Sequence, residues 1–157
     1  MILHLCQLFQ RSFLITALNN SIWASTIVEI IHFIGFFLLV GSSTIINLRI
    51  LGVAARHQPL RDLSTELFPW TWTGLGLAVA TGFLQFGADA TEYYNNIVFY
   101  RKLEIILVAF VVTVFVYRIT HRDHVSVANR IMALSCLLLW VGAILAGVDV
   151  PAFTGVG

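Results

Sequence analysis

Residues 23–49 read WASTIVEIIHFIGFFLLVGSSTIINLR, and this stretch decides the fold. As a helix rising ~1.5 Å per residue, it is long enough to cross the ~30 Å hydrocarbon core of a bilayer. Glu29 and His32 lie inside it, about one helical turn apart. An ionisable side chain at the bilayer centre costs about 2.5–3.5 kcal/mol, so this pair is the first candidate for a functional site.

The composition is that of an integral membrane protein. Hydrophobic residues make up 59% of the 157 positions and charged residues only 11%, which is more apolar than a soluble domain of this size. The formal net charge of +1 excludes a strongly basic surface, so the expected partner is the lipid bilayer and not nucleic acid. Cys6 and Cys136 are far apart and predict no disulfide framework.

Residues 1–157 predict a single all-α domain, an integral membrane four-helix bundle with an N-terminal amphipathic segment. Residues 1–20 are expected to lie at the membrane surface. Four spans are expected over about residues 23–49, 67–86, 102–118 and 131–147. Pro69 fits the first turn of the second span, residues 87–101 form a loop, and Pro151 follows the end of the fourth span.

The distribution of Lys and Arg predicts the orientation. Most of these residues flank the loops after the first and third spans. The positive-inside rule therefore places both termini on the periplasmic side of a bacterial inner membrane. Glu29 and His32 would then lie in the outer half of the bilayer, near the level at which Arg101 and Lys102 begin the third span.

Helical phase gathers polar side chains on one stripe of the first span. At about 100° per residue, the stripe occupies a sector of about 60° and should face other helices. Its members are Glu29, His32, Phe36, Ser43 and Asn47. Gly74 and Gly82 lie on a small-residue face of the second span, which lets either a neighbouring helix or a planar ligand approach the backbone.

A buried imidazole in a small helical membrane bundle suggests haem b, because histidine is its usual axial ligand. In this hypothesis His32 is the metal ligand, and Arg101 or Lys102 neutralises the propionates. The cofactor-binding set would be His32, Glu29, Arg101, Lys102, Gly74 and Gly82. No second histidine is predicted at this depth, so a five-coordinate iron, Lys102 or a neighbouring protomer would complete the site.

A structural interpretation remains open beside the haem hypothesis. His32 would then hydrogen-bond Glu29 or a backbone carbonyl and lock two helices together. Glu29 would support the imidazole, exchange protons, or pair with Lys102. In the third loop, His121-x-x-His124 fits either a metal pair or a solvated loop.

Several motifs resemble those of an uncharacterised family of bacterial four-helix inner-membrane proteins of unknown function. They are Ser21-x-Trp23, Glu29-x-x-His32-x-x-Gly35, Val40-Gly41-Ser42, Leu48-Arg49-x-Leu51-Gly52, Phe68-Pro69-Trp70, Thr81-Gly82 and Phe99-x-x-Lys102-Leu103. This resemblance implies the fold and the location. More distantly, the chain is similar to haem-binding membrane bundles such as the membrane-bound protoporphyrinogen oxidase and the copper-resistance D-type domain. That similarity carries over only His32, Arg49 and Lys102, and not the activity of the oxidase.

The leading functional prediction is a haem-binding, oligomeric protein that passes electrons between the membrane quinone pool and a partner on the outer face. The first alternative is a cofactor-free membrane scaffold or a protein that transports protons or ions. The second alternative is an accessory subunit of a larger redox complex. These patterns do not decide whether the protein is an enzyme.

Overall fold

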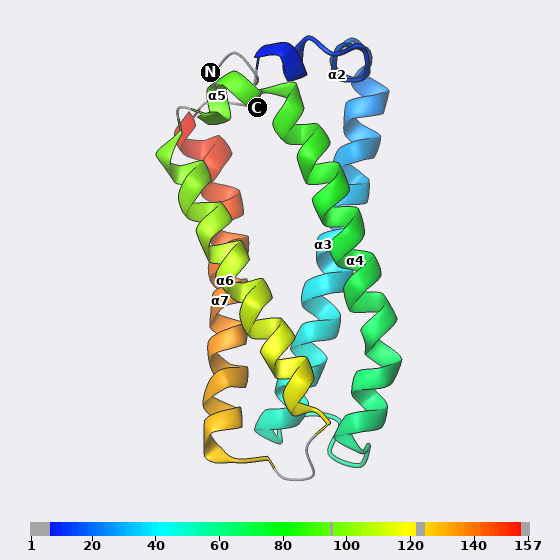
Figure 1. Cartoon of the computed structure of the whole chain (residues 1–157), viewed down its shortest axis with the longest axis vertical. Helices are drawn as coiled ribbons and strands as arrows, with labels where there is room; N and C mark the ends of the chain where they lie inside the picture. Colours follow the sequence, from blue (N-terminus) through cyan, green and yellow to red (C-terminus); the bar gives the residue numbers. More distant parts are fainter. Residues whose placement is uncertain (1–6, 95, 122–124, 155–157) are drawn as a thin grey trace. The chain divides into compact units, whose positions relative to one another are not determined.

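The computed structural model describes residues 7–94, 96–121 and 125–154, and every regular element in these ranges is a helix (Figure 1). Residues 7–10 are helical, and six numbered helices follow. They are α2 (Phe13–Asn19), α3 (Ile22–Leu51), α4 (Leu60–Ala88), α5 (Ala90–Tyr94), α6 (Ile97–Ile119) and α7 (Val127–Thr154). The predicted all-α class is confirmed, but the chain has more helices than the four predicted.

Three helices of the described ranges are long and apolar enough to span a membrane: α3, α4 and residues Val127–Ala146 of α7. This property indicates a membrane protein. The third predicted span lies within α6, which is 23 residues long. Its first turns carry Arg101, Lys102 and Glu104 and its last turn Arg118, and these charges explain why α6 is not among the three.

The second and fourth helices are longer than predicted. Helix α4 begins at Leu60, so Pro69 lies inside the helix and not in its first turn. In the first turn of α4, the negative charge of Asp62 complements the positive end of the helix dipole, and Leu63 is buried. Both features stabilise the helix before the apolar run begins. Helix α7 likewise runs through Pro151 to Thr154, beyond its expected end.

The predicted second loop, residues 87–101, is also largely helical. It contains all of α5 and the beginning of α6. Ala90, at the first position of α5, is fully buried. Residues 90–94 therefore form a short helix between α4 and α6.

The chain divides into two compact units. The first consists of Met1–Leu39 and Trp72–Asn96, and the second of Val40–Thr71 and Ile97–Gly157. The boundary passes through the middle of α3 and of α4. Helices α3 and α4 therefore each contribute one part to each unit, whereas α6 and α7 belong to the second unit.

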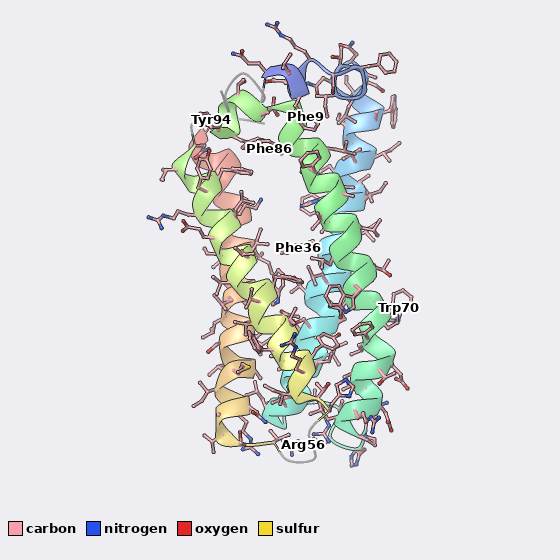
Figure 2. The ribbon with its side chains drawn as sticks, in the orientation of Figure 1. Phe9, Phe36, Arg56, Trp70, Phe86 and Tyr94 are labelled. Atoms are coloured by element: carbon pink, nitrogen blue, oxygen red, sulfur yellow. The ribbon has the colours of Figure 1, made fainter. Side chains whose placement is uncertain are left out.

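In the first unit, the N-terminal segment packs on the end of α4. Phe9 lies 4.8 Å from Phe83 between ring centroids, and Gln10 Nε2 donates a 3.0 Å hydrogen bond to Ala88 O. Figure 2 shows Phe9 near this end of α4. In α2, Ile15 is fully buried whereas Phe13 is 91% exposed, so the exposed side of this helix carries an apolar ring, and its predicted amphipathic character stays a prediction.

In the second unit, α6 and α7 pack side by side in opposite directions (Figure 1). Trp140 of α7 is buried, and its Nε1 donates a 3.0 Å hydrogen bond to Thr113 Oγ1 of α6. Cys136 Sγ lies 3.4 Å from the same Thr113 oxygen. A small polar cluster therefore joins two otherwise apolar helices.

Helix α3 ends in a Schellman motif. Gly52 adopts a φ of 77°, its N–H donates to Arg49 O at 3.1 Å, and Val53 N–H donates to Leu48 O at 2.9 Å. This conformation suits glycine because a left-handed φ carries a steric cost for residues with a Cβ. The motif fixes the last turn of α3, where Arg49 lies.

Candidate functional site

The first unit places His32 of α3 against α4. His32 Nδ1 lies 3.0 Å from Thr81 Oγ1, and the Thr81 hydroxyl donates a 2.6 Å hydrogen bond to Leu77 O one turn earlier. A hydroxyl has one proton, so Thr81 Oγ1 is the acceptor in its bond with the ring and Nδ1–H is the donor. In the neutral imidazole, Nε2 then carries the lone pair.

Gly82 makes room for the imidazole. A Cβ added at Gly82 would lie 3.1 Å from His32 Cε1. This distance is tighter than ordinary van der Waals contact, so a larger residue at this position would displace the ring. The predicted small residue at position 82 therefore lies beside the imidazole itself.

Gly74 and Gly35 allow direct contact between the backbones of α3 and α4. A Cβ added at Gly74 would lie 2.6 Å from both Gly35 O and Leu39 N. A Cβ added at Gly35 would lie 2.7 Å from Ala78 N. Close backbone approach of this kind is typical of small-residue packing between membrane helices.

Glu29 does not share the environment of His32. The Glu29 side chain is exposed, whereas His32 is half-buried against α4. Three residues on a helix rotate a side chain by about 300°, so the two project about 60° apart. That angle is enough for His32 to face α4 while Glu29 lies outside the contact. The predicted inward stripe therefore does not include Glu29.

Arg101 and Lys102 belong to the second unit, whereas His32 belongs to the first. Arg101 forms a 2.9 Å ion pair with Glu104, and both side chains are mostly exposed, at 68% and 62%. Lys102 is half-buried on α6. Their predicted role beside a cofactor on His32 stays a prediction.

Comparison with known proteins defines the family. A family of unknown function, DUF6644, matches residues 10–152, which is most of the chain. The chain belongs to the DUF6644 family. No curated protein and no solved structure matches it. The predicted membership in an uncharacterised family is confirmed, and the similarity to haem-binding bundles stays a prediction.

The residues of this DUF6644 chain fit one part of a haem site and not another. His32 fits in one respect, because its Nδ1 is held by Thr81, as the second nitrogen of a metal-binding histidine usually is held by a neighbour. The predicted space for the macrocycle does not fit, because Gly74 is in contact with the α3 backbone and Gly82 with the imidazole. In the described ranges, no three His, Cys, Asp or Glu side chains come together as a metal site.

From the sequence, Thr81 was noted within the motif Thr81-Gly82 and was not identified as the partner of His32. The two residues are 49 positions apart, and only the pairing of α3 with α4 joins them. The neighbouring motif Thr81-Gly82 was the available signal. It combines a hydroxyl for the ring nitrogen with space for the ring edge.

Proposed function

We propose that this DUF6644 chain is a multi-pass scaffold protein of the bacterial inner membrane, and that His32 locks α3 to α4 without a cofactor. Three helices of sufficient length and hydropathy support the membrane location. The distribution of Lys and Arg supports a topology with both termini in the periplasm. A scaffold of this kind would serve as an accessory subunit of a larger membrane complex.

One observation carries the proposal: the space that could have admitted a ligand is used for helix contact. The His32 ring lies between Thr81, which it hydrogen-bonds, and Gly82, which it touches. Next to it, Gly35 and Gly74 bring the two backbones together. Imidazole and glycines therefore form one continuous helix-pairing surface within the first unit.

A haem-binding electron-transfer protein is the second candidate. The hydrogen bond from Nδ1 to Thr81 favours it, since histidine ligands of metals are held in this way by their other nitrogen. His32 Nε2 would hold the iron, and Thr81 would orient the ring. Bound haem would supply one-electron redox chemistry, with the quinone pool and an outer-face protein as partners and a homo-oligomer as the assembly.

An absorption spectrum separates the two candidates. The detergent-purified protein, produced in cells with adequate haem supply, is measured oxidised and then reduced with dithionite. The scaffold predicts no Soret, α or β band. Bands corresponding to about one haem per chain, lost in His32→Ala, would refute the scaffold and establish the second candidate.

The stability of two variants tests the lock itself. Glutamine can donate a hydrogen bond to Thr81 but is a poor iron ligand, so His32→Gln should remain more stable than His32→Ala. His57→Gln and His57→Ala are the matched controls, because His57 is exposed in the loop between α3 and α4. Equal losses for His32→Gln and His32→Ala would contradict a role in locking the helices.

A further inference from the structure

A cavity of about 280 Å³ lies in the second unit, where α3 and α6 end and α4 begins. Its size is near the lower limit of about 300 Å³ for typical ligand pockets, so it suits a compact group. The cavity is lined by Arg49, Pro59, Leu60, Arg61, Thr120, His121 and Val125. We call these residues the basic cavity.

The lining of the basic cavity is positive. Among the residues that the structure describes, this lining contains two guanidinium groups and one imidazole and no carboxylate. Asp62 and Glu66 lie on α4 but outside the lining. Within residues 7–94, 96–121 and 125–154, neither Arg49 nor Arg61 forms an ion pair with a carboxylate. The cavity therefore favours an anion.

The donors of the cavity are partly fixed in advance. Arg49 Nε donates a 2.9 Å hydrogen bond to Gln58 O across the α3–α4 loop, and the Schellman motif holds its backbone. The remaining guanidinium N–H groups of Arg49 are donors in a rigid planar arrangement that suits phosphate. Thr120 is buried, and its hydroxyl donates to Tyr117 O at 2.7 Å, so it adds no donor to the cavity.

We propose that the basic cavity binds a phosphate group, and that an anionic membrane lipid carries it. Two arginines line this small cavity, and guanidinium groups match the charge and hydrogen-bonding geometry of phosphate. The cavity lies at helix ends, which is the level of lipid headgroups if these helices span a membrane. The lipid as the source of the phosphate rests on the membrane location proposed above, whereas the phosphate chemistry does not.

The test is native mass spectrometry of the full chain in a neutral detergent. Equal amounts of dioleoyl-phosphatidylglycerol and dioleoyl-phosphatidylcholine are added, and the bound lipid is identified by mass. A parallel titration with inorganic phosphate, followed by thermal shift, measures the free anion. The variants are Arg49→Gln, Arg61→Gln and Val125→Phe, which fills the cavity without changing its charge. Arg130→Gln is the control, because Arg130 is exposed but outside the cavity.

The proposal expects phosphatidylglycerol to bind in preference to phosphatidylcholine, with about a tenfold loss in each arginine variant and in Val125→Phe. Arg130→Gln should bind as the unchanged protein does. Binding of inorganic phosphate with the same pattern among the variants would support the phosphate site and identify free phosphate as its source. Equal binding of the two lipids without phosphate binding, or equal losses in Arg130→Gln and Arg61→Gln, would overturn the proposal.

Discussion

Alanine substitution at Gly35 and Gly74, where the backbones of α3 and α4 touch, should distinguish the effect of tight packing on stability from that of helix propensity. At Gly35, an added methyl group would lie 2.7 Å from Ala78 N and 2.9 Å from Gly74 O. Both are backbone atoms of α4, so they cannot move aside as a flexible side chain can. The substitution must push α3 and α4 apart, and we expect it to cost about 1–3 kcal/mol in overpacking.

Helix propensity acts in the opposite direction. Alanine is favoured over glycine in a helix by about 0.8–1.0 kcal/mol, so Gly35→Ala should lower the free energy of unfolding by a net amount of about 0–2 kcal/mol. Gly41 lies on the same helix, and a Cβ there would meet nothing within 4 Å. Gly41→Ala should therefore gain the propensity term alone, about 1 kcal/mol.

The measurement is the free energy of unfolding in mixed micelles, by SDS titration followed with circular dichroism. Propensity cancels in the comparison, so Gly41→Ala should exceed Gly35→Ala by about 1–3 kcal/mol. The same contrast is expected on α4 between Gly76, which has open space, and Gly74, which touches Gly35 O. If Gly35→Ala and Gly74→Ala stabilise the protein as much as their controls do, the two backbones are not in contact and the reasoning fails.

Three further predictions concern polar and backbone interactions. A double-mutant cycle of His32→Ala and Thr81→Val should give a coupling energy of about 0.6 kcal/mol in SDS titration, the average for hydrogen bonds between membrane helices; a value of zero would contradict the bond. Asn47 is fully buried and its Oδ1 has no hydrogen-bond partner, so Asn47→Leu should be neutral or stabilising, whereas Asn47→Asp should cost several kcal/mol. Thermal unfolding measures both variants, and an Asn47→Leu protein less stable than the Asn47→Asp protein would contradict this prediction. Gly52→Ala should cost about 1–2 kcal/mol and Ala55→Gly should stabilise the protein, because the φ angles of these residues are 77° and 50°. Changes of the same sign in the free energy of unfolding of the two variants would refute this prediction.

The sequence predicted α3 to within two residues at each end, because its long apolar run is uninterrupted. The ends of α4 and α7 were wrong for a different reason. Hydropathy reports where an apolar run ends, but a helix continues as long as its backbone hydrogen bonds are satisfied. Residues 60–66 and 147–154 are such continuations beyond the apolar run.

The candidate site was predictable only in part. The cost of burying His32 identified it from the sequence, and helical phase placed it on the side of α3 that carries Phe36 and Ser43. Phase alone could not show that Glu29, about 60° away, would be exposed, because that depends on where α4 lies. The partner Thr81 is distant in the sequence, so its role required the three-dimensional pairing of the helices.

A recurring arrangement of threonines clarifies the role of His32. Three buried threonines donate their hydroxyl proton to the carbonyl one turn earlier and use the same oxygen for a contact with another helix. The internal bonds are Thr71 to Leu67 O, Thr81 to Leu77 O and Thr113 to Ala109 O. Where the hydroxyl proton goes to this carbonyl, the threonine oxygen accepts a hydrogen bond from its partner on the other helix.

Each of these threonine oxygens contacts an aromatic or imidazole side chain that can donate, and Thr71 and Thr113 also contact Ser42 and Cys136. Trp140 Nε1–H donates to Thr113, and the Tyr117 hydroxyl contacts Thr71. His32 Nδ1 lies 3.0 Å from Thr81 Oγ1, the same distance that separates Trp140 Nε1 from Thr113 Oγ1. Indole has no second nitrogen, so the bond at Trp140 can only join helices. Helix pairing alone is therefore enough to explain the hydrogen bond of His32. Imidazole differs from indole in its second nitrogen, and the absorption spectrum tests whether Nε2 binds a haem iron.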